Sequence, residues 1–136
     1  MVRRRGSGGD GRPESGGLSI RVDLPSGARI GPGKIALLEA IARTGSISAA
    51  GRALGMSYRR AWVLVEDLNR GLGQPVVATA AGGSGGGGAS LTPAGETVVA
   101  RYRALEAEAL AAARRHVEAI DAVRGSAWKS DVETPI

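Results

Sequence analysis

The chain has 136 residues and a net charge of +5, and it contains no cysteine and a single histidine, His116. These counts exclude disulfide bridges, thiol catalysis and thiolate metal sites, and one histidine supports neither a histidine-based metal site nor a Ser-His-Asp triad. We therefore expect no enzyme, no metal and no cofactor, whereas the positive charge favours an anionic partner such as nucleic acid.

Residues 1–17 are expected to form a disordered basic tail, because six of them are glycine and four are arginine. This segment lacks the apolar run of a signal peptide, and no stretch of the chain is long and apolar enough to span a membrane. We therefore expect a cytoplasmic protein without membrane contact, whose folded domain covers residues 18–92.

The folded part opens with an alternating pattern that predicts a half-buried strand over residues 18–24. Apolar side chains stand at every second position: Leu18, Ile20, Val22 and Leu24. A turn at residues 25–27 and a short return strand at residues 28–30 would complete a ribbon. A two-stranded ribbon is marginal in isolation, so it must lean on helices.

Three helices are predicted next, over residues 33–44, 47–54 and 58–70. Gly45 and Gly55 end the first two, and Ser46 and Ser57 are N-caps for the second and third. The inner face of the first helix is predicted to hold Ile35, Leu38, Ile41 and Ala42. The inner face of the third is predicted to hold Ala61, Trp62, Leu64, Val65 and Leu68.

Residues 46–64 carry the pattern of a helix-turn-helix. Gly51 supplies the small residue where two helices cross, and Gly55 supplies the turn. Arg59 and Arg60 fall in the first turn of the third helix, where cations oppose the helix dipole, so a chain selected only for stability would carry acids there. Basic residues at that position suit a recognition helix entering the major groove of DNA. The alternative is an ordinary helical hairpin.

We therefore expect the third helix to contact DNA through its first residues, namely Ser57, Tyr58, Arg59 and Arg60. One arginine could instead pair with an acidic side chain, and the candidates are Glu39, Glu66 and Asp67. Contacts to the sugar-phosphate backbone are expected from Lys34, Ser46, Arg52 and the glycine loop residues Gly83, Ser84, Gly85 and Gly86.

The glycine loop is predicted to be the tip of a wing, between strands at residues 76–79 and 89–91. A tip without bulky side chains can approach a sugar-phosphate wall closely and offer backbone N–H donors. A flexible linker is the alternative. A phosphate-binding P-loop is rejected, because the loop lacks the following Lys-Ser/Thr and the strand-to-helix setting.

Thr92 as N-cap and Pro93 at the first position open a last helix that is expected to run to about Val123. We expect this helix, residues 93–124, to dimerise through a seam formed by Val98, Tyr102, Leu105, Ala109 and Ala112. A second stripe, at Leu110, Val117 and Ile120, competes with this register. The alternative is a helix that folds back on its own domain. Residues 125–136 give no clear signal and are expected to be a flexible tail.

Residues 34–95 resemble the N-terminal DNA-binding domain of the ModE family, the molybdate-responsive bacterial transcription regulators. The most specific part of the match is the glycine tract, Gly82-Gly83 and Gly85 to Gly88, followed by Ala89 and by Leu91-Thr92. A broader similarity to LysR-type proteins covers the helix-turn-helix. The resemblance implies a mainly α fold with a small β component: a winged helix-turn-helix with an N-terminal β-ribbon and a long C-terminal dimerisation helix.

The resemblance also implies a homodimer that binds double-stranded DNA at a two-fold symmetric operator and regulates transcription. ModE proteins carry molybdate-binding modules after this domain, and here the chain ends at Ile136, so we expect no direct molybdate binding. Two alternatives remain open. One is an architectural DNA-binding protein without sequence preference, and the other is a direct oxyanion sensor that binds molybdate at the glycine loop.

Overall fold

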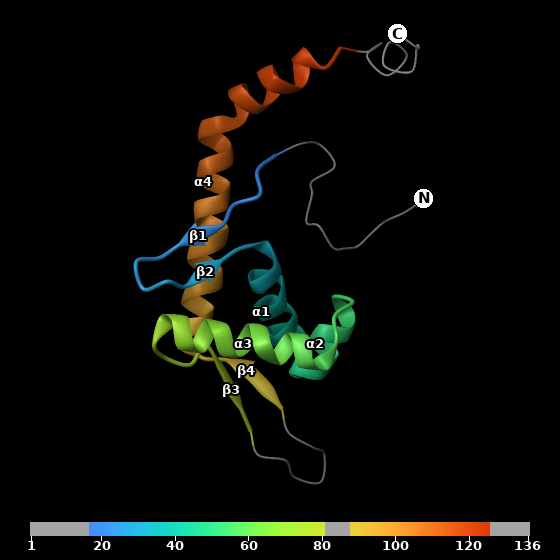
Figure 1. Cartoon of the computed structure of the whole chain (residues 1–136), viewed down its shortest axis with the longest axis vertical. Helices are drawn as coiled ribbons and strands as arrows, with labels where there is room; N and C mark the ends of the chain where they lie inside the picture. Colours follow the sequence, from blue (N-terminus) through green and yellow to red (C-terminus); the bar gives the residue numbers. More distant parts are fainter. Residues whose placement is uncertain (1–16, 81–87, 126–136) are drawn as a thin grey trace.

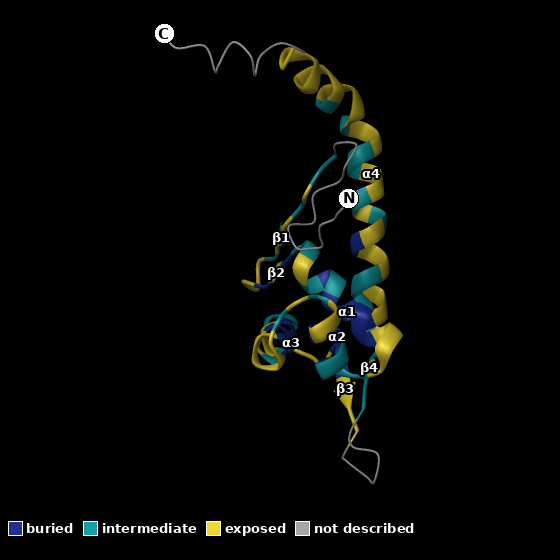
Figure 2. Ribbon diagram, turned by 90° about the vertical axis from the view of Figure 1, so that its right-hand side faces the viewer, coloured by how far each residue is buried: buried dark blue, intermediate teal, exposed yellow. Residues whose placement is uncertain are grey.

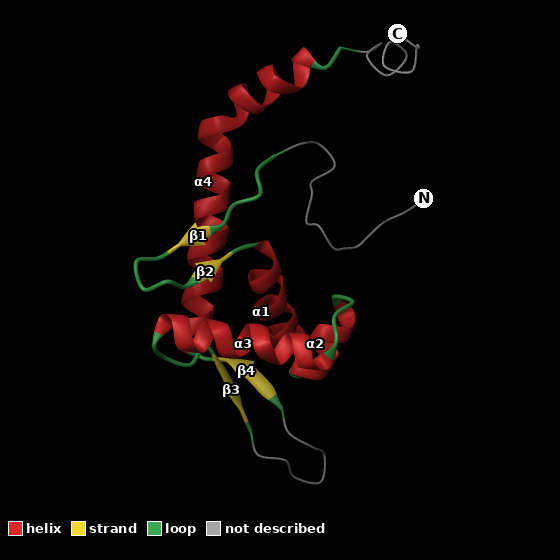
Figure 3. Ribbon diagram, in the orientation of Figure 1, coloured by secondary structure: helices red, strands yellow, loops and turns green. Residues whose placement is uncertain are grey.

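The computed structural model describes residues 17–80 and 88–125. Its elements lie in the order β1 (Val22–Asp23), β2 (Arg29–Ile30), α1 (Pro32–Thr44), α2 (Ile47–Ala53), α3 (Tyr58–Leu72), β3 (Val77–Thr79), β4 (Ala89–Leu91) and α4 (Pro93–Val123). The strands form two antiparallel pairs, β1 with β2 and β3 with β4. Figure 1 and Figure 3 show the two pairs on opposite sides of α3 along the long axis of the molecule.

The N-terminal ribbon is shorter than predicted. The alternation is correct, because Leu18, Ile20 and Val22 are half-buried while the residues between them are exposed. Only Val22–Asp23 pairs, however, and its partner is Arg29–Ile30. Residues 18–21 have no strand opposite them, because the partner strand ends at Ile30 and α1 begins at Pro32. The turn closes after Leu24, where the Gly27 N–H donates to the Leu24 carbonyl at 2.8 Å.

All three predicted N-caps are confirmed. The side-chain oxygens of Ser46, Ser57 and Thr92 each accept a hydrogen bond, at 3.0 Å, from the backbone N–H three residues on. Each bond satisfies one of the N–H groups that a helix start leaves without an intrahelical acceptor. Gly55 has a φ of +73°, which glycine adopts without the strain of a side chain, so the turn of the helix-turn-helix is confirmed as well.

The core is aliphatic and centres on α1, which contacts α2, α3, α4 and β4. Ile35, Leu37, Leu38 and Ile41 are fully buried. The sequence interpretation omitted Leu37 and placed Ala42 on the inner face, whereas Ala42 is exposed. This error has a simple cause: a helix covered on several sides buries an arc wider than one stripe, and the centre of that arc falls nearer Leu37 than Ala42.

The base of the wing, β3 with β4, is fastened to the helix-turn-helix. The Ala89 N–H donates to the Gly45 carbonyl at 2.9 Å, so the first residue of β4 is tied to the turn between α1 and α2. At the other end of the wing, the Val76 N–H donates to Asn69 Oδ1 of α3 at 2.8 Å. The wing base therefore keeps a fixed position relative to both helices of the motif. The predicted glycine tip at residues 82–87 lies outside the described residues.

Helix α4 begins against the wing and then projects past the ribbon (Figure 2). It runs from Pro93 to Val123, as predicted, which corresponds to about 46 Å at 1.5 Å per residue. Its first half packs on its own domain: Tyr102 is 4% exposed and its hydroxyl donates to the Ile20 carbonyl at 2.6 Å. Val98 also packs against the core, so these two seam residues face inward.

An ion pair joins α4 to α1. The Arg103 guanidinium donates two hydrogen bonds to the Glu39 carboxylate, at 2.7 and 2.9 Å, and a third to Glu106 at 2.7 Å. Hydrogen bonding to Arg103 lowers the pKa of Glu39 below its ordinary value of 4.5, against the opposing effect of partial burial. The paired geometry therefore stabilises the folded state when Glu39 is ionised.

We expect Glu39→Gln to lower the free energy of unfolding by about 1 kcal/mol at pH 7, a modest value because both side chains are partly exposed to solvent. The contribution is fully present above about pH 4.5 and is lost as the pH falls through the lowered folded-state pKa of Glu39. Urea unfolding of wild type and variant between pH 7 and pH 3 measures this, with Glu108→Gln as an exposed control on α4. A constant difference across that range would contradict the assignment.

Candidate nucleic-acid interface

The first turn of α3 presents the predicted reading residues to solvent. Tyr58, Arg59 and Arg60 are exposed, and Tyr58 is 57% exposed with its ring packed edge-on against Trp62 at 6.2 Å between centroids. Within residues 17–80 and 88–125, neither Arg59 nor Arg60 forms an ion pair. Two free guanidinium groups therefore stand at the start of this helix.

The acidic residues that could have neutralised these arginines are engaged elsewhere. Glu39 pairs with Arg103. Glu66 and Asp67 both lie near Arg70, at 3.9 and 3.5 Å, in the later turns of α3. The alternative interpretation, in which an acid of this set pairs with Arg59 or Arg60, is therefore wrong for the described residues. The helix is therefore positive at its start, with Arg59 and Arg60, and carries a net charge of −1 in its later turns, with Glu66, Asp67 and Arg70.

Ser57 combines two roles in one side chain. Its oxygen accepts from the Arg60 N–H, and this bond holds the first turn of α3 in place. A hydroxyl has one donor hydrogen besides its acceptor lone pairs, so the Ser57 O–H remains free to donate. The side chain is exposed at the same end of α3 as the two arginines.

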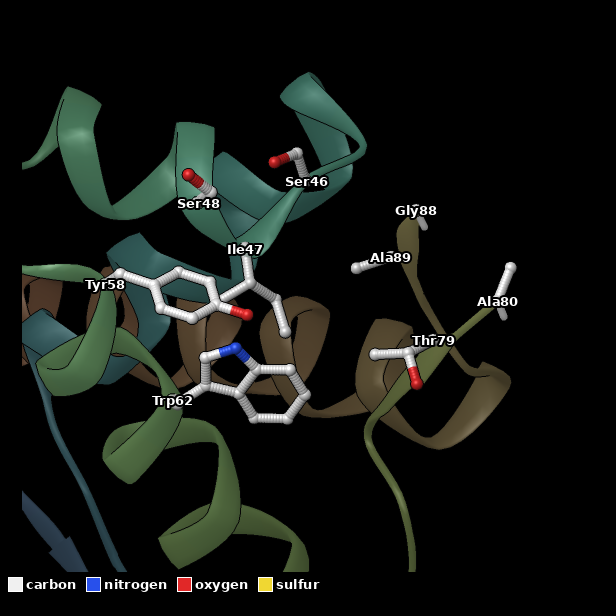
Figure 4. Close-up of a pocket in the computed structure, with 9 residues that line it drawn as sticks. All are labelled: Ser46, Ile47, Ser48, Tyr58, Trp62, Thr79, Ala80, Gly88 and Ala89. Atoms are coloured by element: carbon white, nitrogen blue, oxygen red, sulfur yellow. The ribbon is translucent and has the colours of Figure 1, made fainter. Parts of the chain in front are cut away.

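A cavity of about 300 Å³ lies between the helix-turn-helix and the wing, and we call it the hydroxyl slot. Its polar lining comes from Ser46 and Ser48 at the start of α2, Tyr58 and Trp62 of α3, and Thr79 of β3. Figure 4 shows the two rings on one side and the wing residues on the other, with the two serines on α2. None of the described residues that line the slot carries a charge.

The structure divides the predicted backbone-contact residues. Ser46 lines the hydroxyl slot, and Arg52 lies exposed on α2, with its guanidinium 3.5 Å from the Ser48 hydroxyl. Lys34 lies apart from them, because its ammonium donates to the Arg29 carbonyl at 2.8 Å, next to the ribbon and away from the wing. The wing-tip candidates Gly83, Ser84, Gly85 and Gly86 lie outside the described residues.

Sequence reasoning missed Ser48, Thr79 and the exposed side of Trp62, all of which line the hydroxyl slot. Trp62 was placed in the buried set, and it is half-buried, with its ring forming a wall of the slot. Its spacing of four residues from Tyr58 was the available signal, because residues at i and i+4 meet on one helix face. Thr79 gave no signal, since only the pairing of β3 with β4 turns it towards α3.

These features define a winged helix-turn-helix: α2 and α3 cross at Gly51, α3 has a basic start, and a two-stranded wing is tied to α3 and to the turn before α2. Within the described residues, no group of three or more His, Cys, Asp or Glu side chains is placed to hold a metal ion, and no helix is long and apolar enough to cross a membrane.

Residues 33–96 match the family model of the bacterial regulatory helix-turn-helix proteins of the lysR family. The molybdenum-pterin-binding protein MopB of Rhodobacter capsulatus is 52% identical over 104 residues, which cover 76% of this chain and 37% of MopB. The molybdenum transport protein ModE of Azotobacter vinelandii is 40% identical over 106 residues, or 78% of this chain and 39% of that protein.

The DNA-binding transcriptional dual regulator ModE of Escherichia coli K12 is 40% identical over 71 residues, which cover 52% of this chain and 27% of that regulator. The chain thus spans about two fifths or less of the length of these relatives. The resemblance to the ModE DNA-binding domain that the sequence indicated is confirmed.

Proposed function

We propose that this chain is a DNA-binding transcription regulator of the ModE type, which reads a specific DNA sequence with the start of α3. The observation that carries the proposal is that, within the described residues, Arg59 and Arg60 form no ion pair, whereas the acidic residues of the same helix lie near Arg70. The ModE-named relatives share the domain that holds this pair, and one of them is described as a DNA-binding regulator.

The energetic cost of this arrangement supports a role in binding. A cation in the first turn of a helix opposes the helix dipole and costs about 0.3–1 kcal/mol. Arg59 and Arg60 therefore lower the stability of the folded state, and no ion pair with another described residue offsets this cost. Arginine can pair bidentately with guanine in the major groove, so binding to DNA would turn the same two groups into favourable contacts.

The surroundings of α3 supply the contacts that would fix it on the duplex. Ser57 offers a free hydroxyl, and Arg52 offers an exposed guanidinium on the preceding helix. The wing tip, with Gly83, Ser84, Gly85 and Gly86, follows directly from the wing base and would approach the neighbouring backbone. Contacts of this kind set the register of a protein on DNA, while base contacts specify the sequence.

We also propose that two copies associate through the projecting part of α4. Val98 and Tyr102 are occupied by their own domain, so the seam would begin at Leu105 and continue through Ala109 and Ala112. Further along the helix, Val123 continues this seam from Ala112 in steps of four, three and four residues, and it is 84% exposed. A partner helix packed along these residues would remove that apolar surface from water, and a two-fold dimer would present two recognition helices to one side of DNA.

The dimer predicts a measurable change on substitution. Replacing Leu105 and Val123 with glutamate is expected to lower the self-association of the full chain at least tenfold, because each buried carboxylate would need a partner. Sedimentation equilibrium measures the association, and Thr97→Glu on the same helix is the control. Equal association of all three chains would exclude this face of α4.

In vitro selection from random duplexes tests the function itself. A regulator of this type is expected to enrich one motif with two-fold symmetry and half-sites about one helical turn apart. An architectural protein without sequence preference would enrich none.

Titration of the full chain with molybdate in a calorimeter tests the expectation of no direct molybdate binding, and heat with a saturating curve would contradict it.

A further inference from the structure

The hydroxyl slot is lined by hydrogen-bond donors that carry no charge. Ser46, Ser48 and Thr79 contribute hydroxyls, and Trp62 contributes an indole N–H, while none of its described lining residues is acidic or basic. The lining residues offer hydrogen bonds to an acceptor oxygen without a charge of their own, and the nearby guanidinium of Arg52 lies 3.5 Å from the Ser48 hydroxyl. The slot differs in this respect from the start of α3, where Arg59 and Arg60 are cationic.

These donors are free to act. The Ser46 oxygen accepts from the Ala49 N–H, and the Ser48 oxygen lies 3.5 Å from the Arg52 guanidinium, so both keep their own O–H for a further acceptor. The Trp62 N–H makes no hydrogen bond to an atom of the described residues. Tyr58, packed edge-on against Trp62, adds its ring and its phenolic hydroxyl to the same wall of the slot (Figure 4).

The position of the slot determines which part of DNA reaches it. The slot separates α3 from the wing base, and the Ala89–Gly45 hydrogen bond holds the gap at a fixed width. When a recognition helix lies in the major groove and the wing lies outside it, the strand that borders the groove must pass between the two. The sugar-phosphate backbone, and not a base edge, would therefore face the slot.

We propose that the hydroxyl slot binds one phosphodiester of the DNA backbone together with its deoxyribose. Phosphate oxygens accept from the hydroxyls of Ser48 and Thr79 and from the Trp62 N–H, and the sugar packs against the two rings. This inference rests on the proposed function, since it requires α3 to lie on DNA, and it adds a class of contact that the arginines do not provide.

The chemistry of these contacts gives them a distinctive salt dependence. Lysine and arginine neutralise phosphates and release condensed counterions, so each such contact steepens the fall of affinity with salt. A hydroxyl leaves the phosphate charged and releases no counterion. The slot therefore contributes affinity that is the same at low and high salt, whereas the phosphate contact proposed for Arg52 contributes affinity that salt weakens.

The test measures the affinity of the full chain for a duplex obtained by in vitro selection, at several salt concentrations. The double variant Ser48→Ala/Thr79→Val is expected to bind about tenfold more weakly at every salt concentration, with an unchanged salt slope. Arg52→Ala, which removes the cation proposed to contact a phosphate, is the contrasting variant, and its slope is expected to fall by about one. Thr97→Val, which removes an exposed hydroxyl from α4, is the matched control and is expected to bind like wild type.

Trp62→Phe keeps a ring in the wall of the slot and removes only the N–H donor, so a severalfold loss with an unchanged slope is expected from it as well. Circular dichroism establishes that each variant is folded. If the double variant and Trp62→Phe both bind the selected duplex with wild-type affinity, the proposal that the slot binds the DNA backbone is wrong. The proposed function would remain intact. If the wild-type chain binds neither the selected nor a random duplex, both the slot proposal and the proposed function are wrong. If the double variant has a lowered salt slope, the proposal that the slot contacts a phosphate without neutralising its charge is wrong.

Discussion

Replacing Arg59 and Arg60 together with alanine is expected to weaken binding to the selected DNA by about 2–4 kcal/mol. Each arginine that contacts a base contributes about 1–3 kcal/mol, and neighbouring contacts do not add fully. The preference for the bases read by these residues should also relax. Both side chains are exposed and unpaired within the described residues, so the folded state does not depend on them.

The stability of the same variant is expected to change in the opposite direction. Removing two cations from the first turn of α3 relieves their repulsion by the helix dipole, about 0.3–1 kcal/mol each at low salt. Urea unfolding measures stability, and fluorescence anisotropy with labelled duplexes measures affinity. Arg114→Ala/Arg115→Ala removes the same charge from the exposed part of α4 and separates local contact from net charge. Equal losses for both double variants would contradict base reading by α3.

Gly95→Ala is expected to destabilise the fold by about 3 kcal/mol, a large share of the stability of a small domain. Gly95 is buried in the first turn of α4, and a Cβ there would collide with the backbone carbonyl of Val76. That carbonyl accepts from the Thr92 N–H at 3.0 Å, so moving it would disturb both the wing base and the start of α4. Overlap with backbone is costly because no side-chain rotamer can relieve it.

Gly33→Ala is the matched control, because Gly33 is also helical and nothing lies within 4 Å of the position of its Cβ. This substitution is expected to be neutral or to stabilise by up to about 1 kcal/mol, since alanine loses less backbone entropy than glycine in a helix. Urea midpoints of the two variants test the close approach of α4 to the wing. A Gly95→Ala protein as stable as Gly33→Ala would contradict it.

The local elements of this fold were predictable because their signals are local. Ser46, Ser57 and Thr92 each precede a helix and cap it through a residue three positions on, so the sequence alone locates these helix starts. Gly51 and Gly55 act within the motif that contains them. The 31 residues of α4 lie between a cap and a glycine, and both ends were predicted from those residues.

Features formed by distant segments were not predictable in the same way. Glu39 and Arg103 are 64 residues apart, and nothing near either residue in the sequence identifies the other. The hydroxyl slot joins α2, α3 and β3, and its hydroxyls are ordinary polar residues until the wing folds against the helices. Tyr102 fits a coiled-coil spacing, yet it faces inward because the N-terminal segment offers the Ile20 carbonyl.

The central claim is that this chain reads a DNA sequence, and the ratio of its affinities for selected and random duplexes tests that claim most directly. We predict that the selected duplex binds at least 1,000-fold more tightly at physiological salt, about the lower limit for specific regulators. A ratio near one, maintained as the salt concentration is varied, would identify a protein that binds DNA without reading it and would contradict the account.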